Sequence, residues 1–142
     1  VTVDRWPAQQ DSRRLYTNLF IKNAIWDSLS ALTFLHEITG VAHGDFYAHN
    51  IKIDESSGHL YLLDLGASWV TGTFAKKSEL LEVRAFGILV QELLVKQQDQ
   101  DTEAGKRLKD VLEGLVESCL QSNVNNRPSF REIKALLEAI SR

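Results

Sequence analysis

The stretch from Leu80 to Val95 limits the possible folds of this sequence more than any other segment. In a helix, this stretch would carry apolar side chains on nearly every face, among them Leu81, Val83, Phe86, Ile88, Leu89, Leu93 and Leu94. A helix that is apolar all round must be enclosed by other elements. We therefore expect residues 80–95 to form a buried central helix around which the rest of the chain packs.

Three other segments have helical spacing. From Leu15 to Ile38, apolar residues recur every three or four positions, and Gly40 is a stop signal. The pattern from Leu108 to Leu120 predicts a second amphipathic helix. A Ser followed three residues later by a Glu predicts a capped last helix, from Ser129 to near Ile140.

Two short apolar runs, residues 51–53 and 60–63, flank the turn signal Ser56-Ser57-Gly58 and predict a β-hairpin. Residues 66–78 are rich in Gly, Ser, Thr and Lys, and residues 96–104 are polar, so both read as loops. The expected fold is mainly α with one small β-hairpin, an α+β domain spanning residues 1–142.

Composition excludes several classes of function. A net charge of −3 gives no electrostatic footprint for nucleic acid or anionic lipid. Cys119 is the only cysteine, so it cannot form an internal disulfide; we expect a packed helix position and a reducing, cytoplasmic compartment. No run approaches the roughly 20 apolar residues that a membrane span needs.

The loop from His43 to Asn50, called loop 43–50 below, holds the main candidates for chemistry. Asp45 and Asn50 lie five residues apart, and Asp64 follows the second strand of the predicted hairpin. A lone Asp on a loop is usually a turn residue. Carboxylate and amide oxygens together are ligands that Mg²⁺ accepts, so this group favours a metal site.

Five pieces of the sequence resemble the C-terminal lobe of a protein kinase, in the order of that family. His43 to Asn50 is similar to the catalytic loop H-R-D-x-x-x-x-N, and Asp64-Leu65-Gly66 to the metal-binding D-F-G. The remaining pieces are similar to the family's L-x-Y-L-H, its S-F-G-containing central helix and its R-P-s-F: Leu32 to His36, Ala85 to Leu93, and Arg127 to Phe130. The resemblance covers essentially the whole chain.

The resemblance implies an ATP-dependent phosphotransferase, with a Ser or Thr hydroxyl of a protein as the favoured substrate. Asp45 matches the catalytic base, and Asn50 and Asp64 match the Mg²⁺ ligands. Lys52 stands where the family places an apolar residue beneath adenine and is the candidate cofactor-binding residue. Within the lobe, the family's His, here His43, packs and forms hydrogen bonds.

Other positions depart from the family's pattern. Gly44 replaces an Arg, and Tyr47 replaces a phosphate-contacting Lys. Glu82 stands in place of an Asp that bonds the catalytic-loop backbone, while Arg127 lacks its usual Glu partner because no A-P-E is present. No glycine-rich loop or V-A-I-K lysine precedes Leu15, so we expect the N-terminal lobe to come from a parent chain or a partner chain, and this piece alone to be inactive or nearly so.

Two alternatives stay open. A kinase-like binding module, or pseudokinase, would keep the fold without transfer. H-G-D-x-x-x-x-N is also similar to small-molecule kinases of the aminoglycoside and choline type. Among nearby side chains, we expect Lys76 and Lys77 to be solvated, Trp26 and Phe34 to belong to the core, and Trp69 to be buried under its loop.

Overall fold

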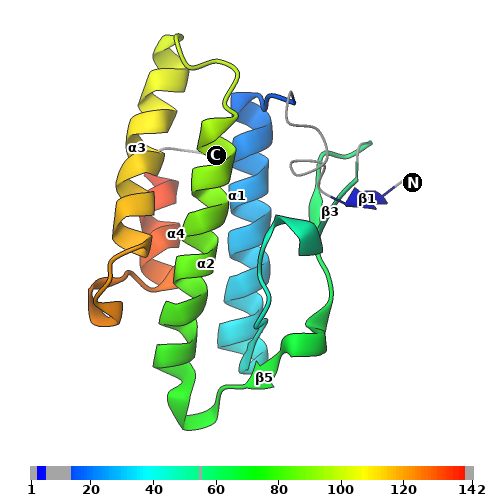
Figure 1. Cartoon of the computed structure of the whole chain (residues 1–142), viewed down its shortest axis with the longest axis vertical. Coiled ribbons are helices and arrows are strands. Elements are labelled where there is room, and N and C mark those ends of the chain that lie inside the picture. The colour runs from blue at the N-terminus through cyan, green and yellow to red at the C-terminus, as the bar shows by residue number, and fades with distance from the viewer. Residues whose placement is uncertain (1–2, 6–13, 55, 140–142) are drawn as a thin grey trace.

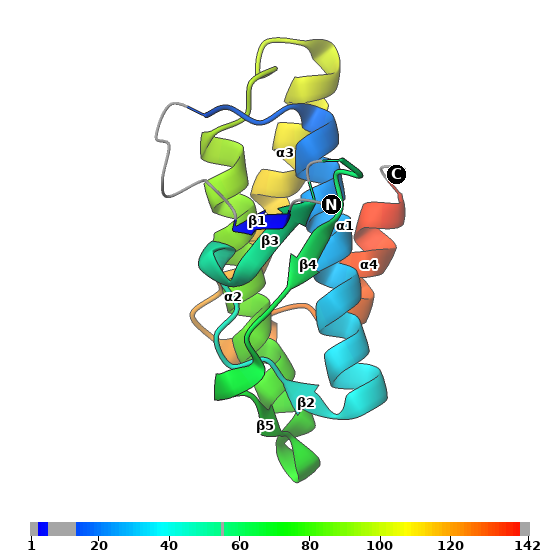
Figure 2. The same cartoon turned by 90° about the vertical axis from the view of Figure 1, so that its right-hand side faces the viewer.

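The computed structural model describes residues 3–5, 14–54 and 56–139. Four helices pack side by side, and the short strands lie along one side of them (Figures 1 and 2). The helices are α1 Asn18–Thr33, α2 Ala75–Val95, α3 Glu103–Cys119 and α4 Phe130–Glu138. A mainly helical domain with small antiparallel sheets is the fold class that the sequence predicts.

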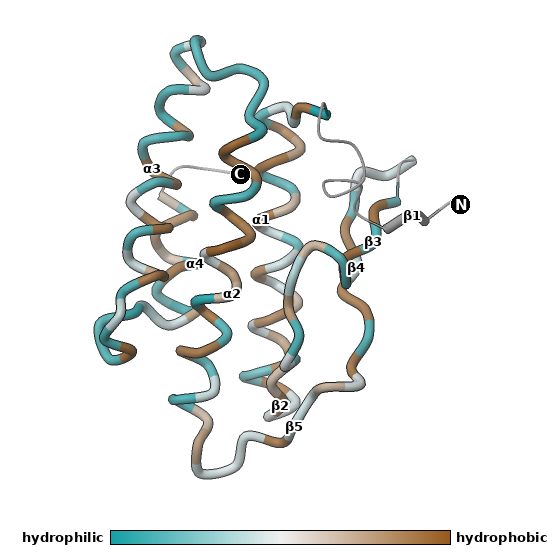
Figure 3. Tube along the Cα trace, viewed as in Figure 1, coloured by the Kyte–Doolittle hydropathy of each residue, from teal (hydrophilic) through white to brown (hydrophobic). Residues whose placement is uncertain are grey.

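Helix α2 is the central helix, as expected, but it is not enclosed on every side, because Leu81 is 55% and Val95 is 75% exposed. Val83, Phe86, Val90 and Leu93 on it are fully buried, and the ring of Phe86 meets that of Phe130 edge to face at 6.1 Å. In Figure 3, α2 has hydrophobic stretches interrupted by hydrophilic residues, whereas α3 is hydrophilic over much of its length. The predicted start at Leu80 is wrong, because Ala and Lys, both good helix formers, extend the helix back to Ala75.

Helix α1 begins at Asn18, later than predicted, whereas the predicted stop of the helical segment at Gly40 is confirmed. The hydroxyl of Thr17 caps it by accepting a hydrogen bond from the amide of Phe20 (3.1 Å). At its other end, it continues as a π-helix, η2, from Phe34 to Thr39, which ends at Gly40 in the left-handed region (φ 67°). Phe34 is 56% exposed, so its predicted place in the core is wrong. Two residues after buried Leu32, it faces almost the opposite side of the helix.

The last two helices carry side-chain caps. Helix α3 begins at Glu103, earlier than predicted, because Thr102 accepts a hydrogen bond from the amide of Gly105 (3.0 Å). Ser129 caps α4 as predicted, accepting from the amide of Glu132 (3.1 Å). The described helix ends at Glu138, and the predicted end near Ile140 lies outside the described residues.

The predicted hairpin forms from β3 Ile51–Asp54 and β4 Leu60–Leu62, with Ile51 opposite Leu62. Asp54 holds the turn by accepting hydrogen bonds from the amide and hydroxyl of Ser56 and from the hydroxyl of Ser57. A third strand, β1 Val3–Arg5, pairs antiparallel with β3, which the prediction of a lone hairpin missed.

The segment predicted as a loop, residues 66–78, is partly ordered by pairing. Strand β5, Trp69–Val70, pairs antiparallel with β2, Val41–Ala42, which comes directly before loop 43–50. Short 3₁₀ turns precede and follow β5, at Leu65–Ala67 and Gly72–Phe74. The pairing brings this segment against loop 43–50.

Arg127 ties the connection between α3 and α4 to the central helix. Its guanidinium donates to the backbone oxygens of Gln121 (2.8 Å) and Leu80 (3.0 Å). Beside it, a carboxylate oxygen of Glu79 accepts the amide of Phe130 at the start of α4 (2.8 Å). Backbone carbonyls therefore bind the guanidinium of Arg127, for which the sequence predicted no Glu partner.

Candidate functional site

Glu82, on buried helix α2, organises the start of loop 43–50. One of its carboxylate oxygens accepts hydrogen bonds from the amide of His43 and from Nε2 of His36, both at 2.8 Å. The other accepts from the amide of Gly44 (2.8 Å). The prediction that Glu82 bonds the backbone of this loop is confirmed.

The surroundings of Glu82 favour its ionised form. Burial alone would raise the pKa of this carboxyl, but the hydrogen bonds from His36 and from the amides of Gly44 and His43 outweigh burial and hold the pKa below its ordinary value. The loop backbone is therefore anchored to a buried negative charge, and such charge-assisted hydrogen bonds are stronger than neutral ones.

His43 connects three parts of the site. Its ring is fully buried, and Nδ1 accepts a hydrogen bond from the amide of Asp45 (3.1 Å). Nε2 lies 2.7 Å from the carbonyl oxygen of Leu63. Since Nδ1 must accept, Nε2 carries the proton and donates it to Leu63, which defines a neutral imidazole. The predicted packing and hydrogen-bonding role of His43 is confirmed.

Asp45 is exposed at the surface of the loop, whereas Asn50 is buried. The amide nitrogen of the Asn50 side chain donates to the backbone oxygen of Asp45 (2.8 Å) and to its carboxylate (3.0 Å). The loop thus closes on itself and presents the Asp45 carboxylate to solvent. The two predicted site residues on this loop are in direct contact.

Asp64 is brought to the same place by the hairpin. The amide of Leu63, the residue before it, donates to the backbone oxygen of Asn50 (2.8 Å). Asp64 is the only residue other than Gly with positive φ (61°) in the part of the chain that the structure describes. Its carboxylate accepts the amide of Gly66 (3.1 Å). Such backbone conformations are costly and cluster at functional sites.

Lys52 follows Asn50 by two residues along β3. Its neighbours Ile51 and Ile53 are buried, so by strand alternation Lys52 is on the opposite face, where it is half-buried. It pairs in register with Tyr61 of β4. The hairpin therefore holds the Lys52 side chain on the face of the sheet that points away from the core.

The donor chemistry of Asp45, Asn50 and Asp64 suits a hard cation. Mg²⁺ is usually bound by one or two carboxylates together with substrate phosphates and water, rather than by a complete protein cage. In the described ranges, no three His, Cys, Asp or Glu side chains form a metal cluster. The residues fit a Mg²⁺ ion shared with phosphate and do not form a closed structural metal site.

A cavity of about 310 Å³ adjoins Asp45, and we call it the Asp45 groove. It is lined by Gly44, Asp45, Phe46, Tyr47, Trp69, Leu81, Glu82 and Ala85. Trp69 is 41% exposed, so its predicted burial is wrong: β5 places it on the groove wall, where its indole N–H donates to the hydroxyl of Ser78 (3.3 Å). Neither Trp69 nor Leu81 was a predicted site residue, and the only sequence signal for this wall of the groove is a Trp on a polar segment.

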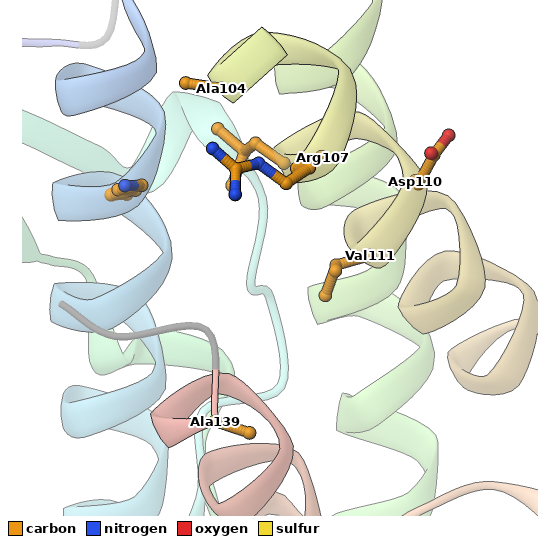
Figure 4. A pocket seen from close by; sticks show the side chains of 7 residues that line it. Ala104, Arg107, Asp110, Val111 and Ala139 are labelled. Carbon is orange, nitrogen blue, oxygen red and sulfur yellow. The ribbon is translucent and has the colours of Figure 1, made fainter.

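Other residues near the site are placed as follows. Lys76 and Lys77 are exposed, as predicted, and Trp26 is partly buried against the core. Another cavity, of about 550 Å³, lies between α1, α3 and the end of α4 and shares no residue with the Asp45 groove (Figure 4). It is lined by both charged and apolar residues, including Lys22, Arg107, Leu108 and Val111.

Comparison with known proteins identifies the fold. No family model matches the sequence, and no curated protein is similar to it. Among solved structures, the chain is similar to a divergent kinase lacking the glycine-rich loop, which regulates membrane ultrastructure of the Toxoplasma parasitophorous vacuole (TM-score 0.71, 16% identity). The match covers 92% of the present chain and 45% of that kinase, so the chain spans less than half of its neighbour. The fold is kinase-like.

No described helix is long and apolar enough to cross a membrane.

Proposed function

We propose that this chain is the C-terminal, catalytic lobe of an ATP-dependent phosphotransferase that acts on a hydroxyl group, with a Ser or Thr side chain of a protein as the favoured acceptor. The observation that carries the proposal is the arrangement of Asp45. Its carboxylate is exposed beside a cavity, held by Asn50, and its amide is fixed by His43.

In the proposed reaction, Asp45 is the base. The acceptor hydroxyl gives its proton to the Asp45 carboxylate while its oxygen forms a bond to the γ-phosphorus of ATP. The bond from that phosphorus to the bridging oxygen breaks, and ADP leaves. Catalysis of this kind depends on positioning and on electrostatics more than on covalent chemistry. The anchoring of loop 43–50 to Glu82 serves the positioning.

Asn50 and Asp64 are the proposed ligands of Mg²⁺. When bound, Mg²⁺ neutralises phosphate charge in reactions of this class. Asn50 is fixed by the loop and Asp64 by the adjoining strand, so the two ligands approach from independent segments. Lys52, on the neighbouring strand, is proposed to face the nucleotide.

The proposal includes a second lobe from a longer parent chain or a partner. The chain corresponds to 45% of the Toxoplasma neighbour. That neighbour is itself described as a divergent kinase lacking the glycine-rich loop, so the lack of such a loop in the present sequence is compatible with a kinase. The second lobe would hold adenine and clamp the phosphates.

Transfer of labelled phosphate from ATP tests the proposal. We expect Asp45→Asn, in the longest natural form of the protein, to reduce Mg²⁺-dependent transfer by about 10²–10⁴-fold, the usual contribution of a positioned base. Asp101→Asn, an exposed residue in the connector between α2 and α3, is the matched control and should retain activity. Equal transfer with and without the Asp45 carboxylate would refute its assignment as the base.

One observation favours the second candidate, a kinase-like binding module. No Lys or Arg of the described residues lines the Asp45 groove, and Tyr47 stands where the family has its phosphate-contacting Lys. The described lining of the groove then supplies no positive charge to stabilise the transferring phosphoryl group. Binding of Mg²⁺-nucleotide near residues 43–50 and 64–66 in NMR spectra, with no transfer by any form of the protein, would favour this candidate.

A further inference from the structure

The Asp45 groove depends on the absence of a side chain at Gly44. Gly44 has a φ of 85°, and a Cβ atom there would overlap the carbonyl oxygen of Ala67 and lie 3.0 Å from the Trp69 ring. The missing side chain therefore lets the Trp69 ring lie directly against loop 43–50. In a sequence with a longer residue at position 44, this wall of the groove could not form.

Three aromatic rings line the groove, and their environments fix them. The indole of Trp69 is held by its hydrogen bond to Ser78. Tyr47 stacks on His49, with ring centroids 5.8 Å apart and planes 15° apart. Phe46 is buried and meets the His43 ring edge to face. Of the three, Tyr47 and Trp69 are 40% and 41% exposed, so part of each side chain is accessible to a ligand, while His49 stacks on one face of the Tyr47 ring.

The charge of the groove has a single sign. Among the described residues, its lining includes the acidic residues Asp45 and Glu82 and no Lys, Arg or His. Three donors already occupy Glu82. Asp45 keeps capacity to accept, because a carboxylate has about four acceptor sites and only one described hydrogen bond reaches it, from Asn50.

We propose that the groove recognises an organic cation on the acceptor substrate, with the cation on the faces of Trp69 and Tyr47 and the acceptor hydroxyl at Asp45. Aromatic faces attract ammonium and guanidinium groups through the negative potential of the ring, and Trp is the strongest partner. The adjoining carboxylate of Asp45 also attracts a cation. The volume of about 310 Å³ is at the small end for ligand sites and suits one such group.

The placement of the hydroxyl rests on the proposed function, whereas cation binding does not. The same chemistry has two sources: a free ammonium alcohol, or a basic side chain beside a Ser or Thr in a peptide. A neutral substrate of equal shape would lose both the ring attraction and the carboxylate attraction. Trp69 and Tyr47 are thus specificity-determining residues in this proposal.

Calorimetric titration of the chain with matched ligand pairs tests the inference. The first pair is (2-hydroxyethyl)trimethylammonium and its uncharged carbon analogue, 3,3-dimethylbutan-1-ol. The second is a short Ser peptide with a neighbouring Arg and the same peptide with citrulline. We expect the cationic member of at least one pair to bind about tenfold more tightly, or about 1.4 kcal/mol, which lies between an exposed and a desolvated cation–π contact. Which pair discriminates identifies the source.

Substitutions locate the binding. Trp69→Leu should remove most of the preference for the cation, and Tyr47→Leu, on a separate segment, should reduce it as well. Tyr61→Leu is the control, because Tyr61 is exposed on β4 and does not line the groove. Circular dichroism of each variant confirms its fold before titration.

Equal binding within both pairs, no binding of either cation, or an unchanged preference in folded Trp69→Leu and Tyr47→Leu would each overturn the inference. Failure of the proposed function is distinguishable: cation binding without phosphate transfer leaves this inference standing, whereas transfer without preference for a cation refutes it alone.

Discussion

Removal of the Glu82 carboxylate should both destabilise the fold and release loop 43–50. Glu82→Ala leaves three donors without their acceptor: Nε2 of His36 and the amides of His43 and Gly44. A hydrogen bond to a charged group contributes about 1.5–3 kcal/mol, and an unsatisfied buried donor costs about 1–3 kcal/mol. Gly44 is exposed, so water can replace part of the loss. We expect a loss of about 3–5 kcal/mol, a large share of a typical stability of about 5–15 kcal/mol.

Glu82→Gln separates charge from shape. Its single carbonyl oxygen can still accept from His36 and His43, which share one oxygen in the native site, while its amide N–H₂ faces the amide of Gly44. A loss of about 2 kcal/mol follows from one broken charge-assisted hydrogen bond. Urea denaturation followed by circular dichroism measures both losses. Glu117→Gln, exposed on α3, is the matched control and should change stability by less than about 0.5 kcal/mol.

The pH dependence gives a second test with a defined sign. The pKa of Glu82 is lower in the folded protein than its ordinary value of 4.5, so the unfolded chain takes up a proton first as the pH falls. The contribution of Glu82 is fully present above that value and is lost as the pH falls through the folded pKa. The stability difference between wild type and Glu82→Gln should therefore shrink in acid. A Glu82→Ala protein as stable as wild type, or a difference that grows in acid, would refute the assigned role.

Two further predictions concern the site loop and the core. Gly44→Ala should lower the free energy of unfolding by about 1–3 kcal/mol in urea denaturation, because a Cβ at this backbone conformation is strained and overlaps Ala67. It should also shift the NMR signals of residues 67–69. The control Gly114→Ala, with open space around it on α3, should be neutral or slightly stabilising. Burial raises the pKa of the Cys119 thiol to about 12, with Arg127 opposing the shift, so the native protein should react with a thiol reagent at pH 8 only after denaturation; rapid labelling of the folded chain would contradict this.

Elements with a strong local sequence signal could be predicted from the sequence. The all-round apolar pattern identified α2, and Ser56-Ser57-Gly58 identified the hairpin turn. Glu82 could be assigned to the loop backbone only through the family resemblance, because nothing local distinguishes it from an exposed helical Glu. The structure brings Asp45 into contact with Asn50 and places Asp64 beside Asn50 through Leu63, while their chemical roles stay predictions.

The features that the sequence did not reveal depend on tertiary pairing. Strands β1 and β5 have two or three residues each, too short for a period-two pattern to stand out. Each is defined by its partner strand, and the pairing of β5 is also what exposes Trp69 on the groove wall. Local propensity carries no information about such pairs.

The π-helix at the end of α1 limits how the length of this chain can vary during evolution. His36 lies inside this turn and reaches Glu82 from it. Each residue of an α-helix rotates the following side chains by about 100°, so deleting one residue before His36 would turn its ring away from Glu82. Insertions and deletions should be excluded from η2, Phe34–Thr39, and concentrate instead in the connector between α2 and α3. Alignments of distant relatives should therefore contain no gap from Phe34 to His43, whose amide donates to Glu82.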